Sequence, residues 1–216
     1  MMRVVYQFGL PRSGLYAVAE WYLEGIGETV NQRVGGGFKD AFAPLDPQAA
    51  HFVTIEGLEI ERVREARAHC AARGADAWVQ LRDPYNWFAS LCRGVQGGVI
   101  NWRPAAPLEL WKGYARHCLN NGFWLAYNRW FSDSNYRRHL AERFCFRRLS
   151  GGQPWQHVPS RGGGSSFDGE RFTSHAQQMT VLKRYAAFVD DAEWRGHFDD
   201  EVVALARELF GMERPW

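Results

Sequence analysis

The stretch Val4-Val-Tyr-Gln-Phe-Gly-Leu-Pro-Arg-Ser-Gly14 decides how the rest of the chain is interpreted. Its first part, Val4 to Phe8, is an apolar run typical of a buried strand, and a pattern with helical spacing follows Gly14. Gly9 and Gly14 bound the short turn between the two. Because the N–H groups at a helix N-terminus attract anions, this layout is typical of a loop that holds a phosphate group.

A second segment, Leu81-Arg-Asp-Pro-Tyr-Asn-Trp-Phe-Ala-Ser90, repeats the passage from strand to helix. Asp83 is the expected N-cap, with Pro84 at the first helical position. Arg82 ends the strand, and Ser90 lies one to two turns into the helix. A strand-end guanidinium and a helix hydroxyl can hold one phosphate from two sides. The alternative is a structural Arg–Asp pair with a serine in the helix interior.

Strands alternate with helices along the chain, which predicts a parallel sheet flanked by helices in a single domain, 1–216. The predicted strands are 3–9, 51–56, 75–81 and 123–127, with a short edge strand at 143–147. The predicted helices are 13–25, 59–73, 84–93, 108–120, 134–142, 173–188 and 199–210, the last stopped by Gly211. The predicted loops are 26–50, 94–107 and 150–170. Ligands of such sheets bind beyond the carboxyl ends of the strands, where Gly9, Glu56, Arg82 and Tyr127 are expected.

Composition restricts the possible partners. The chain has 216 residues, a net charge of only +2 and 46% hydrophobic residues, as expected of a soluble globular protein without a general affinity for nucleic acid. No run approaches the ~18 apolar residues that span a bilayer. The four cysteines fit neither a metal site nor a CxxC pair, and we expect them to be buried free thiols; most of the aromatic residues should also be core. We therefore expect a cytoplasmic protein with no membrane contact.

The first loop differs from a nucleoside triphosphate loop. Leu15 and Tyr16 stand where the G-x-x-x-x-G-K-[ST] pattern has its lysine and its hydroxyl, the groups that bind the terminal phosphates and Mg²⁺. The backbone N–H groups do not depend on those side chains, so the loop can still hold an anion. Arg12 supplies a planar charged fork for it, and Ser13 a hydroxyl. The alternative is a plain strand-to-helix turn with a surface arginine.

Together, Gly9-Leu-Pro-Arg-Ser-Gly14 and Arg82-Asp-Pro-(x)5-Ser90 resemble the donor site of the P-loop sulfotransferase family, in particular a group of bacterial sulfotransferase-like proteins. The Trp21 to Gly25 segment and the acidic strand end Thr54-Ile-Glu56 are similar to that group as well. The resemblance implies a three-layer fold of the P-loop nucleoside triphosphate hydrolase kind. It also implies 3′-phosphoadenosine 5′-phosphosulfate as donor and no metal.

The resemblance assigns the two ends of the donor to different segments. The 5′ end would contact residues of the first loop, namely Gly9, Pro11, Arg12, Ser13, Gly14 and Leu15. The 3′-phosphate would contact Arg82 and Ser90, and Arg161, Gly162 and Gly163 are similar to the late loop that closes over it. Many family members place two threonines after the last glycine of the first loop, where Leu15 and Tyr16 stand here.

The implied activity is transfer of a sulfuryl group to a hydroxyl or amine of an acceptor. Arg12 would steady the charge on the leaving phosphate, and Glu56 is the expected base that takes the proton of the acceptor. His157 and His175 are further candidates for the base, whereas His51 lies at the wrong end of its strand. A carbohydrate, a small hydroxylated metabolite and a peptide tyrosine remain open as acceptors, as does the oligomeric state. The loops 26–50, with Asn31 to Arg33, and 94–107, with Trp102, are expected to shape the acceptor site.

Two other functions fit the same motifs. One is a kinase-like phosphotransferase of the same broad class, which would need Mg²⁺ and a nucleoside triphosphate. The other is a non-catalytic module that binds a nucleotide or a partner, favoured by Leu15 and Tyr16.

Overall fold

The computed structural model describes residues 4–27, 31–35, 45, 50–98, 105–147, 156–159, 164–169 and 171–216. Five strands form one sheet in the order β2-β3-β1-β4-β5, and every neighbouring pair is parallel. Their bounds are β1 Val4–Gly9, β2 Asn31–Gly35, β3 His51–Glu56, β4 Asp76–Leu81 and β5 Trp124–Ala126. The predicted parallel α/β architecture is therefore confirmed.

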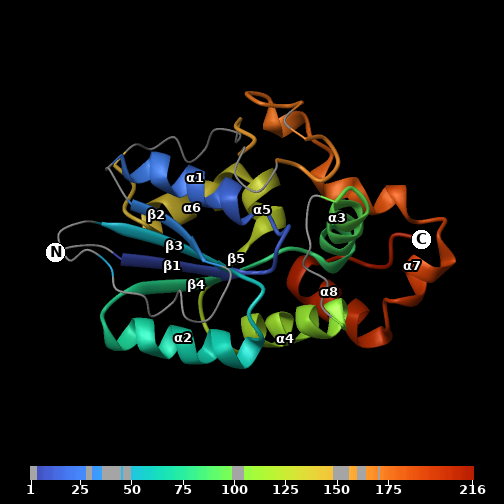
Figure 1. Ribbon diagram of the computed structural model, residues 1–216, viewed down its shortest axis with the longest axis horizontal. Helices are drawn as coiled ribbons and strands as arrows, with labels where there is room; N and C mark the ends of the chain where they lie inside the picture. Colours follow the sequence, from blue (N-terminus) through green and yellow to red (C-terminus); the bar gives the residue numbers. More distant parts are fainter. Residues whose placement is uncertain are drawn as a thin grey trace.

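Helices cover both faces of the sheet (Figure 1). One face packs against α1 Leu15–Ile26, α5 Tyr127–Ser132 and α6 Ser134–Arg143. The other packs against α2 Ile60–Ala72 and α4 Pro107–Asn120. Beyond the carboxyl ends of the strands, α3 Pro84–Gln96 and α8 Asp200–Phe210 pack against α4, with α7 Ala192–Gly196 farther out (Figure 1). Alternation along the strands supplies the two cores: Val5 and Trp78 face one, Phe8 and Val79 the other.

The direction of the connections places a crevice at the carboxyl end of β1. The helix after β1, α1, covers one face of the sheet, whereas α2, the helix after its neighbour β3, packs on the opposite face (Figure 1). Adjacent strands whose connections diverge in this way leave a space outside their carboxyl ends, which is where ligands of open parallel sheets bind. The segments ending at Gly9, Glu56 and Leu81 meet there.

Local signals read from the sequence are present at several helix ends. Asp83 caps α3 by accepting a hydrogen bond from the Asn86 amide at 2.8 Å, and Pro84 occupies the first turn. Gly211 ends α8 in the left-handed region at φ 66°. The cysteines are free, as predicted, but Cys92 is only half-buried, and Cys145 is exposed in the turn after α6.

Three secondary-structure predictions are wrong. The predicted loop 26–50 contains β2, whose polar sequence carries no alternation and which is a strand through its pairing with β3. The predicted edge strand 143–147 is the end of α6 followed by a turn. Its alternating Phe144 and Phe146 instead pack side by side against Trp21 of α1.

The third error concerns the predicted helix 173–188, which consists of turns and the 3₁₀ helices η2 Ala176–Gln178 and η3 Val181–Ala187. Side chains of the neighbouring segments bind its backbone. Arg82 donates to the Val181 carbonyl, and Asn86 donates to the Leu182 carbonyl while accepting from the Arg184 amide at 2.7 Å. These tertiary bonds take backbone groups that an α-helix would use internally.

The burial of the aromatic residues and the lengths of the helices were also predicted from the sequence. Most of the tryptophans are buried in the two cores, as expected, among them Trp78, Trp87, Trp111 and Trp130. Among the helices of the described ranges, none has the length and apolarity needed to cross a bilayer.

Candidate functional site

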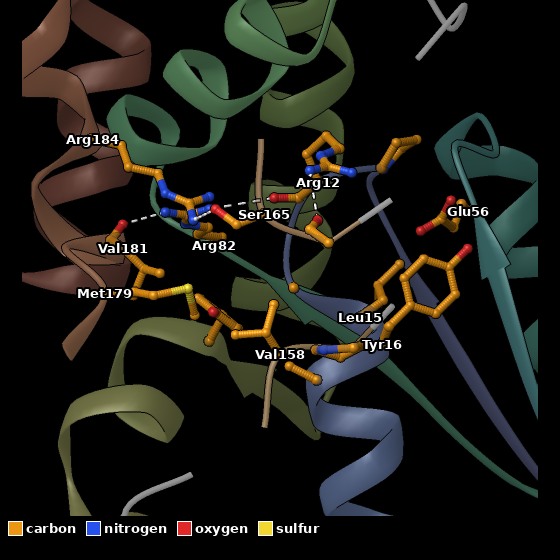
Figure 2. Close-up of a pocket in the computed structure, with 16 residues that line it drawn as sticks. Arg12, Leu15, Tyr16, Glu56, Arg82, Val158, Ser165, Met179, Val181 and Arg184 are labelled. Carbon is orange, nitrogen blue, oxygen red and sulfur yellow. Dashed lines mark hydrogen bonds between the residues drawn. The ribbon is translucent and has the colours of Figure 1, made fainter. Parts of the chain in front are cut away.

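A pocket of about 860 Å³, counting its opening to solvent, lies at the carboxyl ends of β1, β3 and β4. Its lining residues are Pro11, Arg12, Gly14, Leu15, Tyr16, Ala17, Glu56, Arg82, Tyr127, Val158, Pro159, Gly164, Ser165, Met179, Val181 and Arg184. Figure 2 shows Arg82 and Arg184 on one side of the pocket, Glu56 and Tyr16 on the other, and Arg12 between them.

Steric limits fix the turn between β1 and α1. A Cβ atom at Gly9 would lie 2.7 Å from a Leu15 methyl and 3.0 Å from the Gln80 carbonyl oxygen. At Gly14, where φ is 84°, it would lie 2.1 Å from the Tyr127 ring. Arg12 also lies in the left-handed region, at φ 65°, which is uncommon for a residue with a Cβ. The two glycines thus allow the close approach that the tight turn requires.

The carbonyl groups of this turn are all bound to protein donors. Within residues 9–15 the acceptor–donor pairs are Gly9 with the Gly57 amide, Leu10 with the Ser13 amide, Pro11 with the Trp87 indole, Arg12 with Arg82, Ser13 with Gln80, Gly14 with the Val18 amide and Leu15 with Gln7. α1 has no acidic residue in its first turn and no side-chain cap. Its positive end is therefore available to an anion in the pocket.

A ladder of buried polar side chains crosses three strands beneath the turn. The Thr54 hydroxyl donates to the Gln7 amide oxygen at 3.2 Å, and the Gln7 nitrogen donates to the Gln80 amide oxygen at 2.7 Å. The Gln80 nitrogen then donates to the Ser13 carbonyl at 2.9 Å. All three side chains are fully buried. The sequence analysis did not identify this ladder. The signal that could have revealed it is the presence of polar residues within strands that are otherwise apolar.

Arg82 and the first turn are in contact, as the sequence predicts. The Arg82 guanidinium donates to the Arg12 carbonyl at 3.3 Å, to the Ser90 hydroxyl at 3.1 Å and to the Val181 carbonyl. The Arg82 Cζ atom, the central carbon of the guanidinium, lies 5.3 Å from the centre of the Tyr127 ring. The hydrogen bonds of the Asp83 carboxylate go instead to the α3 cap and to Asn128. The alternative of an Arg–Asp pair does not describe the observed bonds.

Arg184 is a site residue that the sequence analysis did not identify. It comes from η3 and donates to the Ser90 hydroxyl at 3.0 Å and to the Ser165 hydroxyl at 2.6 Å. Its guanidinium lies 3.7 Å from Asp168. The Ser90 hydroxyl thus accepts hydrogen bonds from both Arg82 and Arg184, and it donates one to the Asn86 carbonyl. Ser90 is fully buried. An arginine within an apparent amphipathic helix gave no sequence signal.

Burial disfavours the charge on all three arginines. It is the largest cause lowering the pKa of Arg12, of Arg82 and of Arg184, and Arg82 lowers the pKa of both others further. Glu56 raises the pKa of Arg12 and Asp168 raises that of Arg184, but the net direction stays downward. The nearby carboxylates therefore do not offset the burial of this positive charge.

Arg12 links the turn to the C-terminal part of the chain. Its guanidinium donates to the Ser166 hydroxyl at 2.6 Å and to the Gly164 carbonyl at 2.9 Å. Together with Arg82 and Arg184, it is thus bound to acceptors of the segment 164–181. We call these three residues the arginine cluster.

Glu56, the last residue of β3, lies on the opposite side of the pocket (Figure 2). Burial raises its pKa, while the charge of Arg12 and the neighbouring Tyr16 hydroxyl act in the other direction. Tyr16 stands at a position where the sequence analysis saw only a missing threonine.

The other predicted site residues lie in different places. Ser13 is fully buried, and its hydroxyl has no partner among the described residues. His51 is at the amino end of β3, away from the pocket, as expected, and His157 and His175 are exposed. Arg161, Gly162 and Gly163, Trp102 and the side chains of Asn31 to Arg33 lie outside what the structure describes.

Comparison with known proteins adds no relative. A scan against protein-family models, a search of curated proteins and a search of solved structures each found no match to this chain. The chemistry of the pocket is therefore inferred from its own residues.

Proposed function

We propose that the protein binds 3′-phosphoadenosine 5′-phosphosulfate and transfers its sulfuryl group to a hydroxyl or amine of an acceptor, without a metal ion. The observation that carries this proposal is the convergence of the arginine cluster and the N-terminus of α1 on one pocket, with the pKa of each arginine lowered by burial. A ligand with several negative charges would offset that burial.

The pocket offers two separate places for negative charge. One is the first turn of α1 with Arg12, and the other is Arg82 with Arg184, held side by side by Ser90. A nucleotide with a phosphosulfate at one end and a phosphate at the other has its charges divided in the same way. In this proposal Ser90 orients the two guanidiniums, and these contact the 3′-phosphate.

The remaining wall suits the uncharged part of such a donor. Apolar side chains line it, among them Leu15, Val158 and Met179 (Figure 2). Mostly apolar pockets with a few placed polar groups are typical of nucleotide and cofactor sites.

During transfer, Arg12 and the amide groups of α1 would stabilise the charge that develops on the leaving phosphate. Glu56 would take the proton of the acceptor. The step needs the acceptor oxygen or nitrogen in line with the sulfur atom, between Glu56 and the turn.

A phosphotransferase acting on a nucleoside triphosphate is less well supported by the side chains after Gly14. Leu15 is buried beneath Gly9, and the Tyr16 side chain extends toward Glu56 (Figure 2). Neither supplies the ammonium or the Mg²⁺-binding hydroxyl of such a loop.

Thermal unfolding in the presence of EDTA tests the proposal. We expect adenosine 3′,5′-bisphosphate, the product of the donor, to raise the melting temperature, since ligand at 100 times its Kd adds ~2.7 kcal/mol. Stabilisation by Mg-ATP alone, in a matched measurement without EDTA, would support the phosphotransferase instead. A protein that responds to neither ligand would contradict both enzymes and favour a non-catalytic module, which the engagement of all three arginines by segment 164–181 also favours.

A further inference from the structure

The Gln80 side chain holds the turn between β1 and α1 from the side of the sheet. Its amide nitrogen donates to the Ser13 carbonyl at 2.9 Å, and both residues are fully buried. Gly14, the next residue of the turn, lines the pocket. In a planar trans peptide the carbonyl and the following N–H point in opposite directions. A Ser13 carbonyl that is held toward Gln80 therefore turns the Gly14 N–H away from the sheet, to the side on which the pocket lies.

The Gly14 amide is placed to receive an anion. Gly14 is the N-cap of α1, with φ 84° and ψ 22°, and its carbonyl accepts from the Val18 amide. Within the part of the chain that the structure describes, no acceptor bonds to the Gly14 N–H. The N–H groups at the start of a helix carry the positive end of its dipole and bind anions when they point at them. The direction of this N–H thus decides whether it contributes.

The Gln80 amide is fixed in one orientation. The Ser13 carbonyl can only accept, so the Gln80 nitrogen must face it. The Gln7 nitrogen likewise faces the Leu15 carbonyl at 3.3 Å, and it donates to the Gln80 oxygen at 2.7 Å. The Thr54 hydroxyl completes the ladder by donating to the Gln7 oxygen at 3.2 Å. A flipped Gln80 amide would place like groups against each other at both of its ends.

We propose that Gln80 is a positioning residue that aims the Gly14 amide at the 5′-phosphate of the donor, an inference that rests on the proposed sulfuryl transfer. Gln80 is buried beneath the turn and acts on the anion through the peptide between Ser13 and Gly14. Without its bond, that peptide can rotate and the N–H loses its fixed direction. Donors that are already oriented stabilise negative charge best, because they need no reorganisation when the charge arrives.

Two nucleotides separate this role from a general effect on stability. Adenosine 3′,5′-bisphosphate places a phosphate at α1, whereas adenosine 3′-monophosphate lacks that group and reaches only Arg82 and Arg184. The ratio of their dissociation constants, measured by calorimetric titration in EDTA, therefore reports the contact at α1. The wild type should favour the bisphosphate about 100-fold, as expected of charge-assisted hydrogen bonds from Arg12 and the helix amides.

Gln80→Met keeps the length of the side chain and removes the donor to Ser13. It should reduce the ratio about tenfold, the size of one hydrogen bond to a charged group, and leave the affinity for the 3′-monophosphate unchanged. Thr54→Val is the matched control, because it breaks a bond of the same ladder and keeps the one between Gln80 and Ser13. Both variants should melt several degrees lower, since each leaves a buried polar group unpaired, but only Gln80→Met should change the ratio.

The wild type provides a second measurement that does not depend on the folding of a variant. The amide proton resonance of Gly14 should move downfield when the bisphosphate is added, because a hydrogen bond to an anionic oxygen deshields the proton. The 3′-monophosphate should move it much less, since that ligand has no group at α1.

The two proposals fail differently. An unchanged ratio in Gln80→Met, an equal reduction in Thr54→Val, or a Gly14 amide that does not respond to the bisphosphate would each overturn the positioning role while leaving the donor site intact. A wild type that binds neither nucleotide would contradict the proposed function and with it the positioning role.

Discussion

The buried cation Lys112 and the arginine cluster are neutralised to different extents. At the junction of α4 and α8, Lys112 is 6% exposed and lies 2.5 Å from Glu109, 2.8 Å from Asp199 and 3.4 Å from Glu201. Burial alone would lower the pKa of Lys112, but the carboxylates that accept its hydrogen bonds raise it above its ordinary value.

The arginine cluster shows the opposite balance. Burial and mutual repulsion lower the pKa of its members, and many of their hydrogen bonds go to neutral carbonyls and hydroxyls. Lys112 is matched by acidic residues, whereas Arg137, which is also buried, donates to the neutral carbonyls of Trp130 and Phe131. Neutral carbonyls can therefore bind a structural cation as well. In the arginine cluster, three such guanidiniums converge on one pocket, and under the proposed function the ligand supplies the balancing negative charge.

The largest expected effect comes from changing the turn between β1 and α1, which lines the pocket of the arginine cluster. Gly14→Ala should lower the free energy of unfolding by about 3 kcal/mol, because the new Cβ overlaps the Tyr127 ring in a left-handed backbone. Gly74→Ala is the control, since Gly74 has a φ of 67° and open space around it, so only the backbone strain of about 1–2 kcal/mol applies. Equal losses in denaturant unfolding would mean that the contact with Tyr127 does not constrain the turn.

Removing a cation from the unmatched cluster should affect binding more than stability. Arg184→Met should weaken adenosine 3′,5′-bisphosphate about 100-fold, as expected for charge-assisted hydrogen bonds lost from one guanidinium. The melting temperature without ligand should change little, because the repulsion from Arg82 disappears together with the bonds to Ser90 and Ser165. Calorimetric titration beside a melting curve checks both. Unchanged affinity would remove Arg184 from the site.

Removing the matched cation should do the reverse. Lys112→Met should lower the free energy of unfolding by about 1–2 kcal/mol, a figure reduced for the partial exposure of its partner carboxylates. Affinity for adenosine 3′,5′-bisphosphate should stay at the wild-type value. If Lys112→Met lowered the affinity for adenosine 3′,5′-bisphosphate as much as Arg184→Met does, Lys112 and the arginine cluster would not differ in function.

The smallest effect is a pH-dependent gain in stability in Glu56→Gln. The pKa of Glu56 is raised in the folded chain, so between its ordinary and raised values the folded protein binds more protons than the unfolded one. Stability of the wild type therefore falls as the pH rises through that window. Glu56→Gln should be more stable at pH 7 by about 1 kcal/mol or less, and the gain should vanish below pH ~4. A gain that persists in acid would have another cause.

The sequence predicted the elements whose signals are local. Asp83-Pro84 specified the start of α3, and the glycines at 9 and 14 specified the turn, because caps and turns depend on nearby residues. The parallel topology then brought Arg82 to the turn, since carboxyl ends of parallel strands share one edge.

What the sequence did not predict depends on distant partners. Arg184 enters the pocket because Asn86 and Arg82 bind the backbone of η3, so the apparent helix 173–188 is replaced by 3₁₀ turns. Gln7 and Gln80 can form their hydrogen bond only when the strands that carry them are paired in the sheet. Long-range hydrogen bonds of this kind leave no periodic pattern in the chain.

Calorimetric titration with two nucleotides tests the central claim most directly. In EDTA, the wild type should bind adenosine 3′,5′-bisphosphate at least about tenfold more tightly than adenosine 5′-monophosphate, because only the former reaches Arg82 and Arg184 while its 5′-phosphate lies at α1. Ser90→Ala, which releases both guanidiniums, should reduce this preference. Equal affinities for the two nucleotides, or no binding of either, would contradict the account.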